Sequence, residues 1–401
     1  MRILLITEAL VLGGAETFVL RLARRLRQDG HDAEVLCLNP DLEDPRLVAQ
    51  YGDLVIHRVP RFGIRTLKRA DRIAGWLKLD PMLQQRRAQR WIERNLLGRF
   101  DVYHSHLFGA DWLMARIKRR NPAIRLVSTL HGDYALLAAR HEGTERTRIR
   151  NWRSKLTATL NAIDRWVTIS PDQQRQFLDG FGVKPERLVA IANGYVPPAP
   201  LEAQGRSPHE GVKFVMVARG MREKGWGFLV EAFLRLDGDC SLLLVGEGAY
   251  LDQLRQLHGG NPRISFAGAD PNPVARIATA DVFVHPSIYR AESMPTVIIE
   301  ALFAGLPVIA TRVGSVEAMI ATPSGERAGM LVEPDAASLS DELAAAMQAS
   351  LDDPALRRRH AALAPAAFAK FDMGQCAAAY ARLYAEVAGS ASISSATISS
   401  H

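Results

Sequence analysis

The sequence predicts an α/β protein with two doubly wound parallel sheets. Short apolar runs alternate along the chain with longer segments of helical periodicity, which is the pattern of buried parallel strands joined by helices. This pattern stops at a proline-rich stretch near residues 196–200 and then starts again. A length of 401 residues also suits two domains. We therefore expect a first domain over 1–198, a linker over 199–211 and a second domain over 212–372.

The first half opens with a strand at 2–7, a loop that contains Gly13 and Gly14, and a helix at 17–29. A glycine pair after a strand lets the backbone approach a ligand closely, but the spacing is not that of a dinucleotide fingerprint. The other elements of this half are expected as strands at 33–38, 55–59, 101–106, 126–130, 165–170 and 189–194, and as helices at 64–99, 110–120, 148–162 and from residue 171.

The second half repeats the alternation and ends in a tail of small polar residues. Residues 389–401 consist largely of Ser, Ala, Gly and Thr, so we expect them to be disordered. The expected strands are 213–218, 241–245, 264–268, 282–285, 307–310 and 329–333, and the expected helices are 228–236, a segment ending near 258, 274–279, segments beginning near 295 and 314, 336–349, 354–371 and 375–387.

The composition is that of an ordinary globular protein, with 48% hydrophobic and 23% charged residues. The N-terminus does not read as a signal peptide, and no apolar run approaches the ~20 residues that cross a bilayer. We expect a cytoplasmic protein, either free or peripheral at the inner face of the cytoplasmic membrane. Cys37, Cys240 and Cys376 match no metal spacing and are expected to be buried.

The charge is unevenly distributed along the chain. The net charge is +7 overall but +12 over residues 1–200, which hold 33 Lys and Arg against 21 Asp and Glu. Residues 61–99 alone hold 11 basic and 3 acidic side chains. Two readings of this segment stay open: a solvated helix face, or a surface for anionic lipid head groups or an anionic acceptor. We do not expect a nucleic-acid partner.

Two patterns that could signal metal binding are interpreted otherwise. His104 and His106 are expected on opposite faces of their strand, so that they do not converge on one ion. Asp237 and Asp239 form a D-x-D pattern, but they precede a strand and therefore lie at the sheet edge opposite the ligand edge. We expect no metal and no cofactor.

Cationic and carboxylate side chains mark the ligand edge of the second half. Arg219 ends the strand 213–218 and Lys224 follows before a helix, an arrangement that binds anions. Further on, Glu292 and Glu300 lie eight positions apart around the start of a helix, with Ser293 expected as its N-cap and Pro295 in its first turn. Open N–H groups at a helix start suit a phosphate, and carboxylates accept hydrogen bonds from sugar hydroxyls.

These residues resemble the E-x7-E signature of the retaining family-4 glycosyltransferases with the GT-B fold. The resemblance covers nearly the whole chain and includes the R-x4-K-G spacing and a T-x-H motif that ends in His131. It implies two Rossmann-like domains that face each other across a cleft. It also implies that a helix at about 373–388 crosses back to the first domain.

The resemblance implies a role for each candidate residue. Glu292 and His131 are expected beside the donor sugar as the catalytic residues. Gly14 of the N-terminal glycine loop is expected near the donor phosphate. The remaining donor-binding residues are the diphosphate clamp, the backbone N–H donors at the helix start and the ribose-binding carboxylate, namely Arg219, Lys224, Met294, Thr296, Val297 and Glu300. Ser293 and Met294 depart from the Gly-Phe of many relatives, which leaves the contact with the donor sugar open.

The expected activity is metal-independent transfer of a hexose-type sugar from a UDP- or GDP-sugar to a saccharide or lipid-linked acceptor. Retention of the anomeric configuration and a role in bacterial cell-surface polysaccharide or glycolipid synthesis follow from the resemblance only. Alternatives are a related nucleotide-sugar enzyme, such as an epimerase or a sugar-phosphate synthase, and a scaffold that binds membranes or polyanions. A nicotinamide-dependent dehydrogenase lacks its glycine fingerprint here.

Overall fold

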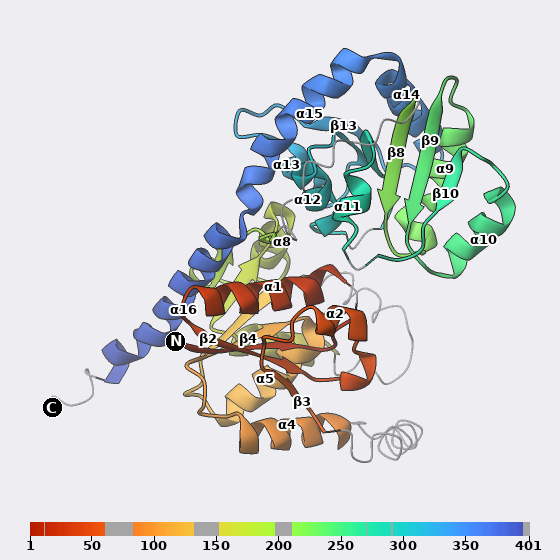
Figure 1. Cartoon of the computed structure of the whole chain (residues 1–401). Helices are drawn as coiled ribbons and strands as arrows, with labels where there is room; N and C mark the ends of the chain where they lie inside the picture. The colour runs from red at the N-terminus through yellow and green to blue at the C-terminus, as the bar shows by residue number, and fades with distance from the viewer. Residues whose placement is uncertain are drawn as a thin grey trace. The chain divides into compact units, whose positions relative to one another are not determined.

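The computed structural model describes residues 1–11, 13–60, 83–131, 152–196, 211–270, 272–289 and 292–395. Its contacts divide the chain into two units, Met1–Gly194 with Met373–His401, and Tyr195–Asp372. Both units contain parallel sheets with helices between the strands, as the sequence predicts for a GT-B fold (Figure 1). The expected linker at 199–211 lies, apart from Gly211, outside the described residues.

Unit 1 contains a seven-stranded parallel sheet of order β3-β2-β1-β4-β5-β6-β7. The order changes direction between β1 and β4, so the carboxyl ends of these two strands flank the switch point at which such sheets bind ligands. The described elements of this unit are β1 (Arg2–Thr7), α1 (Gly14–Gln28), β2 (Asp32–Cys37), α2 (Pro45–Ala49), β3 (Ile56–Arg58), α4 (Leu83–Asn95), β4 (Val102–His106), α5 (Phe108–Arg120), β5 (Leu126–Leu130), α7 (Trp152–Ala162), β6 (Arg165–Thr168), α8 (Pro171–Arg175), β7 (Leu188–Ala190) and α16 (Met373–Ser395).

Both faces of this sheet are buried, which explains its continuous apolar strands. Ile3 and Leu5 of β1 pack in the core under α1 and α16, whereas Leu4 and Ile6 pack in the core with α4 and α5 (Figure 1). Removal of this apolar surface from water stabilises the fold by about 25 cal/mol per Å². The three cysteines are buried, as expected, and form no disulfide in the part of the chain that the structure describes.

The C-terminal helix is longer than the sequence suggested. α16 continues to Ser395, so the expectation of a disordered tail from residue 389 is wrong for residues 389–395. Alanine and serine are compatible with a helix that is already nucleated by packed turns. Those turns carry Tyr380 and Tyr384, which are fully buried against unit 1.

Unit 2 contains a six-stranded parallel sheet of order β10-β9-β8-β11-β12-β13, and its switch point lies between β8 and β11. One face carries Phe214 and Leu242 in a core with α9 and α14. The described helices and strands of this unit are β8 (Val212–Val217), α9 (Trp226–Leu234), β9 (Cys240–Val245), α10 (Ala249–His258), β10 (Ile264–Phe266), α11 (Val274–Ile277), β11 (Val282–His285), α12 (Thr296–Phe303), β12 (Val308–Thr311), α13 (Val316–Ile320), β13 (Gly329–Val332), α14 (Leu339–Asp352) and α15 (Pro354–Phe368).

The D-x-D pattern lies where the sequence places it, at the amino-terminal edge of the second sheet. Asp239 directly precedes β9, and its carbonyl oxygen accepts a hydrogen bond of 2.9 Å from the Val212 N–H at the start of β8. Asp237 donates its backbone N–H to Gln348 of α14. The pattern is therefore a turn that joins structural elements, away from the carboxyl ends of the strands.

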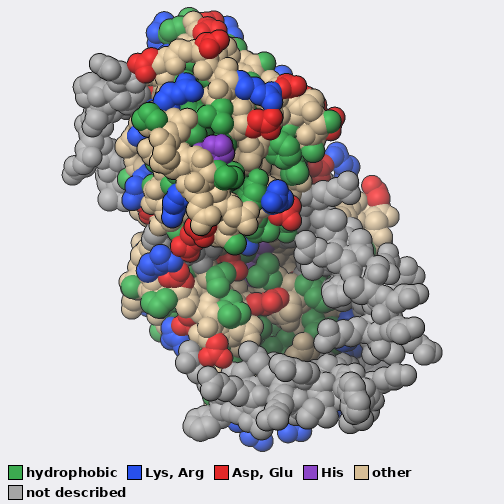
Figure 2. Space-filling view, turned by 90° about the vertical axis from the view of Figure 1, so that its right-hand side faces the viewer, with side chains coloured by type: hydrophobic (Ala, Val, Ile, Leu, Met, Phe, Trp, Pro, Cys, Tyr) green, Lys and Arg blue, Asp and Glu red, His purple; other side chains and the backbone are tan. Residues whose placement is uncertain are grey.

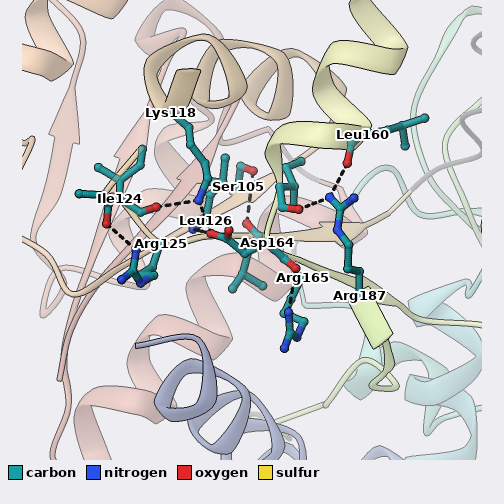
Figure 3. Close-up of polar contacts among 12 residues, drawn as sticks. Ser105, Lys118, Ile124, Arg125, Leu126, Leu160, Asp164, Arg165 and Arg187 are labelled. Atoms are coloured by element: carbon teal, nitrogen blue, oxygen red, sulfur yellow. Dashed lines mark hydrogen bonds and ion pairs between the residues drawn. The ribbon is translucent and has the colours of Figure 1, made fainter. Parts of the chain in front are cut away.

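A partly buried ion pair holds the amino-terminal edge of the first sheet together (Figure 3). Lys118 of α5 contacts the carboxylate of Asp164, and it also donates a 2.8 Å hydrogen bond to the carbonyl of Ile124. Asp164 accepts a second bond of 2.8 Å from the Leu126 N–H at the start of β5. This pair is structural, because it lies at the edge opposite to the carboxyl ends of the strands.

Candidate functional site

The candidate site in unit 2 is built across the switch point between β8 and β11. After β8 the chain makes a short 3-10 turn, Arg222–Lys224, and Gly225 then adopts a left-handed conformation with φ of 85°. A Cβ at Gly225 would overlap the carbonyl oxygen of Pro286, so only glycine lets this turn pack against the end of β11. The Ile288 N–H donates to the Glu223 carbonyl at 2.9 Å and fixes the same approach.

Two predicted site residues meet directly at this switch point. The ammonium of Lys224 forms a hydrogen-bonded ion pair with Glu292, and their side chains are only 9% and 11% exposed. The same carboxylate oxygen of Glu292 accepts a 2.9 Å bond from the Ser287 hydroxyl. The Lys224 ammonium also lies 4.9 Å from the centre of the Tyr289 ring. Ser287 and Tyr289 were not among the predicted site residues, although both follow the predicted strand that leads into the E-x7-E stretch.

His285 lies behind this ion pair at the end of β11. Its ring is 2% exposed, and its Nε2 atom is 3.8 Å from the Glu292 carboxylate. Neither ring nitrogen has a hydrogen-bond partner in the described part of the chain. Burial lowers the pKa of His285 to about 4, with a smaller opposing effect of Glu292, so the ring is neutral at pH 7.

The carboxyl group of Glu292 stays ionised in spite of its burial. Burial alone would raise its pKa, but the neighbouring His285 and Lys224 and the hydrogen bonds from Lys224 and Ser287 outweigh this effect, so its pKa lies below the ordinary value. Because His285 is neutral near pH 7, Lys224 is the charge that stabilises the carboxylate there. The switch point thus holds an ionised Glu292 beside the ammonium of Lys224.

Arg219 lies at the carboxyl end of β8 with an exposed side chain. Its carbonyl accepts a 2.9 Å bond from the indole N–H of Trp226, and the Gly220 N–H donates to the Glu247 carbonyl at 2.7 Å. Arg219 therefore stands beside the glycine-rich loop that follows β9. Its guanidinium has no ion pair with another described residue, which leaves its positive charge available to a ligand.

The start of α12 offers backbone donors, although its cap differs from the prediction. Pro295, and not Ser293, occupies the N-cap position, and no side chain of a described residue caps the helix. The Ser293 carbonyl instead accepts a 2.8 Å bond from Ser315, and a Cβ at Gly314 (φ 51°) would overlap the Glu292 carbonyl. These contacts from the loop after β12 hold Ser293 out of the cap position.

The backbone N–H groups of Met294, Thr296 and Val297 make no hydrogen bond to any described residue. They lie at the positive end of the α12 dipole, where an anion is stabilised. Glu300 lies in the second turn of the same helix and is 6% exposed. Unit 2 thus brings all its predicted site residues to the carboxyl edge of one sheet.

The predicted residues of unit 1 also lie at the carboxyl edge of their sheet. Gly14 is the first residue of α1, which begins three positions earlier than expected, and Gly13 precedes it in extended conformation. His131 follows β5, and its ring packs on Phe18 of α1 with 5.3 Å between the ring centres. The basic segment 61–99 is described only from residue 83, where α4 carries its arginines on an exposed face.

The prediction that His104 and His106 point to opposite faces is wrong. Residues two apart on a strand share a face, and their ring centres are 4.1 Å apart. His104 bonds to the Tyr384 hydroxyl at 2.6 Å and to Thr129 at 2.8 Å, while His106 Nδ1 lies 2.9 Å from His131 Nε2. His106 is therefore a neighbour of a predicted site residue that the sequence reading missed.

The buried rings of His104, His106 and His131 predict that acid lowers the stability of unit 1. Burial lowers the pKa of His131 to about 3 and, together with the neighbouring histidines, the pKa values of His104 and His106 well below the ordinary value. In the unfolded chain each histidine titrates near pH ~6.5. The unfolded state therefore binds protons that the native state does not, and the free energy of unfolding falls as the pH drops below about 6.5. The expected slope is about 1.4 kcal/mol per pH unit for each histidine.

Urea unfolding between pH ~7.5 and ~4.5, followed by the tryptophan fluorescence to which the buried Trp166 of unit 1 contributes, measures this slope. Replacing His104 with glutamine should lower the slope by about 1.4 kcal/mol per pH unit, the contribution of one histidine. An unfolding free energy that does not change between pH ~6.5 and ~5 would contradict the neutral, buried state of these rings.

Comparison with known proteins gives matches along both units. Residues 12–197 match the family model described as Glycosyltransferase Family 4, and residues 211–353 match the model described as Glycosyl transferases group 1. Together the two models cover most of the chain. The boundary between them falls in the stretch that separates the two sheets.

Individual proteins match over nearly the full chain. A phosphatidyl-myo-inositol mannosyltransferase of Mycobacterium leprae is 27% identical and covers 95% of both chains. An MMP alpha-(1->4)-mannosyltransferase of Mycolicibacterium hassiacum is 28% identical over 86% of this chain and 88% of that protein. The crystal structure of Anabaena HepE in complex with UDP superposes with a TM-score of 0.71 at 20% identity, over 96% of this chain and 100% of that one.

Proposed function

The chain is a family-4-type glycosyltransferase of the GT-B fold, and from this premise we propose that it transfers a hexose-type sugar from a nucleotide-diphosphate sugar to a lipid-linked or saccharide acceptor. The observation that carries the proposal is the Lys224–Glu292 ion pair at the switch point of unit 2. The ammonium of Lys224 can bind a phosphate of the donor, and the carboxylate bonded to it can accept a hydrogen bond from a sugar hydroxyl.

The chemistry requires that negative charge be neutralised as the donor breaks down. The bond between the anomeric carbon and the β-phosphate oxygen breaks, the acceptor hydroxyl oxygen bonds to that carbon, and its proton leaves with the released diphosphate. We assign the neutralisation to Lys224 and Arg219 and to the open N–H groups of Met294, Thr296 and Val297. Preorganised donors of this kind are worth about 3 kcal/mol of barrier each.

The two carboxylates take different parts in this proposal. Glu292, ionised and 11% exposed, accepts hydrogen bonds from sugar hydroxyls and stabilises the positive charge that develops at the anomeric carbon. Glu300, on α12, binds the hydroxyl pair of the ribose. His131 and Gly14 of unit 1 are proposed to contact the donor sugar and its phosphate.

We further propose that the reaction needs no metal ion and retains the anomeric configuration. Among the described residues no three His, Cys, Asp or Glu side chains are grouped so that they could hold an ion. Arg219 and Lys224 would supply the positive charge instead. Retention is carried over from the family resemblance.

A UDP- or GDP-sugar is proposed as the donor, since a structural neighbour was crystallised with UDP and two relatives are named mannosyltransferases. For the acceptor, the name of one relative specifies a phosphatidylinositol. A glycolipid or a cell-surface polysaccharide precursor is therefore the class that we propose.

The experiment is a transfer assay with a panel of UDP- and GDP-hexoses, with lipid and saccharide acceptors, and with chelator present. Release of the nucleoside diphosphate together with a new glycoside of unchanged anomeric configuration is the expected result. A sugar phosphate, or an isomerised donor without transfer, would instead identify the synthase or epimerase alternative. Binding of polyanions without any turnover would identify the scaffold alternative.

A lipid-linked acceptor also predicts contact with an anionic membrane surface. No helix in the described part of the chain is long and apolar enough to cross a bilayer. We propose that the contact is peripheral and that it uses the exposed arginines of α4. On the face that Figure 2 shows, basic and acidic side chains of the described residues are interspersed and form no broad patch of one sign. The contact is therefore expected to depend on a local cluster and to be sensitive to salt.

The vesicle experiment compares anionic phosphatidylglycerol with neutral phosphatidylcholine. Co-sedimentation with the anionic vesicles should fall several-fold when Arg86, Arg87 and Arg90 are replaced by glutamate. Replacement of the exposed Arg358 and Arg359 of α15 in unit 2 by glutamate is the control and should change the co-sedimentation little. Equal binding of both vesicle types would contradict an electrostatic membrane contact.

A further inference from the structure

The histidine beside the predicted sugar site has a buried partner. His106 is fully buried on β4, and its Nδ1 atom lies 2.9 Å from Nε2 of His131. The two rings are nearly parallel, with 27° between their planes and 5.1 Å between their centres. One of the two nitrogens must donate and the other must accept, and which does so decides what His131 can offer to a ligand.

The surroundings of His106 decide which of the two nitrogens, Nδ1 of His106 or Nε2 of His131, carries the proton. Its other nitrogen, Nε2, is buried and has no hydrogen-bond partner among the described residues. The polar groups nearby are already occupied, because His104 uses both its nitrogens on Tyr384 and Thr129, and Thr129 also bonds to Tyr380. A proton on His106 Nε2 would thus be a buried donor without an acceptor, which is rarer in proteins than an unpaired acceptor.

The favourable arrangement places the proton of His106 on Nδ1. That N–H donates to Nε2 of His131, which must then be unprotonated. Since a neutral imidazole carries one N–H, the proton of His131 lies on Nδ1. The Nδ1 atom of His131 has no hydrogen-bond partner among the described residues, so its N–H is available to a ligand.

We propose that His106 is a positioning residue that holds His131 in the tautomer with its proton on Nδ1. His131 then offers a hydrogen-bond donor to an oxygen atom, such as a sugar hydroxyl, and cannot act as a base through its Nδ1 atom. The link to a sugar rests on the proposed function, whereas the tautomer does not. The hydroxyls of Tyr380 and Tyr384 on α16 support the arrangement by saturating Thr129 and His104.

The first test reads the tautomer directly. Two-bond proton–nitrogen correlation spectra of the ligand-free protein labelled with ¹⁵N-histidine distinguish protonated from unprotonated ring nitrogens. The signal of His131 is assigned by its loss in His131→Asn. A protonated Nδ1 and an unprotonated Nε2 are expected for His131, and the opposite pattern would overturn the proposal. Because no ligand is present, this result does not depend on sugar transfer.

The second test uses two variants of the partner residue. In His106→Asn the amide nitrogen takes the place of Nδ1 and still donates, so the tautomer of His131 should be kept and kcat/KM should stay within about threefold of wild type. In His106→Leu the donor is lost, so the tautomer should change and kcat/KM should fall about tenfold, the value of one hydrogen bond. Equal spectra and activities for both folded variants would overturn the positioning role.

The two tests also separate this inference from the proposed function. The expected tautomer in a protein that transfers no sugar would leave the positioning role standing and remove the transferase assignment of the site. A thermal melt of each variant shows whether it is folded, and if His106→Leu does not fold, the wild-type spectrum and His106→Asn still decide.

Discussion

Replacing Lys224 with alanine is expected to lower kcat/KM for sugar transfer by about 10²- to 10³-fold. The ammonium of Lys224 is the buried cation at the switch point of unit 2, and its partner Glu292 also accepts a hydrogen bond from Ser287. A diphosphate that replaces Glu292 as its partner places the leaving charge on a preorganised cation. Steady-state kinetics with the best donor of the panel measure the loss, and most of it should appear in kcat.

The chain supplies a matched control for this prediction in Lys118. Lys118 forms a partly buried ion pair with Asp164 at the amino-terminal edge of the first sheet (Figure 3). Lys118→Ala should lower the stability of unit 1 and leave kcat/KM of the folded protein unchanged. If both lysine variants lose activity to the same degree, the loss reflects stability, and Lys224 has no special role in transfer.

Replacing Glu300 with alanine is expected to lower kcat/KM by about 10- to 100-fold or more, mainly through a higher KM for the donor. Glu300 is 6% exposed in the second turn of α12, and each hydrogen bond from a ribose hydroxyl to a charged acceptor is worth about 1.5–3 kcal/mol. An interaction made equally in the ground and transition states raises KM and leaves kcat in place. Donor titrations at saturating acceptor separate the two constants.

Glu317 is the matched control for the Glu300 variant. It is a carboxylate on α13 of the same unit, but it is exposed and paired with Arg312 and Arg327. Glu317→Ala should leave both constants within about twofold of wild type. A Glu300 variant whose KM for the donor is unchanged would remove Glu300 from the donor site.

The sequence predicts the fold well because the determining signals are local. A strand buried on both faces, such as β1, reads as a continuous apolar run, and the helix that follows repeats its apolar side chains every four residues. The cation and the carboxylate at the switch point of unit 2 were also predictable. Residues at the carboxyl ends of the strands that flank a switch point must lie close together, as Lys224 and Glu292 do.

The details in which the structure differs from the prediction depend on contacts between distant parts of the chain. Ser293 is an adequate cap by its local sequence, but the loop at Gly314 and Ser315 engages its carbonyl and leaves the cap position to Pro295. His285 has no local signal for its place behind Glu292, because that place results from the packing of β11 beside β8.

The histidine pair was misread for a different reason. The period of two along a strand places His104 and His106 on one face, so their proximity was available from the sequence. Their partners were not, since Tyr380 and Tyr384 come from α16 at the other end of the chain.

Calorimetric titration of the protein with uridine, guanosine, adenosine and cytidine diphosphates in the presence of chelator tests directly whether unit 2 holds a metal-free diphosphate site. We expect that one of them binds without metal and that Lys224→Ala weakens this binding at least tenfold, whereas Lys118→Ala does not. Binding of none of the four, or binding only after a divalent metal is added, would contradict a donor site in which Lys224 and its neighbours neutralise the diphosphate.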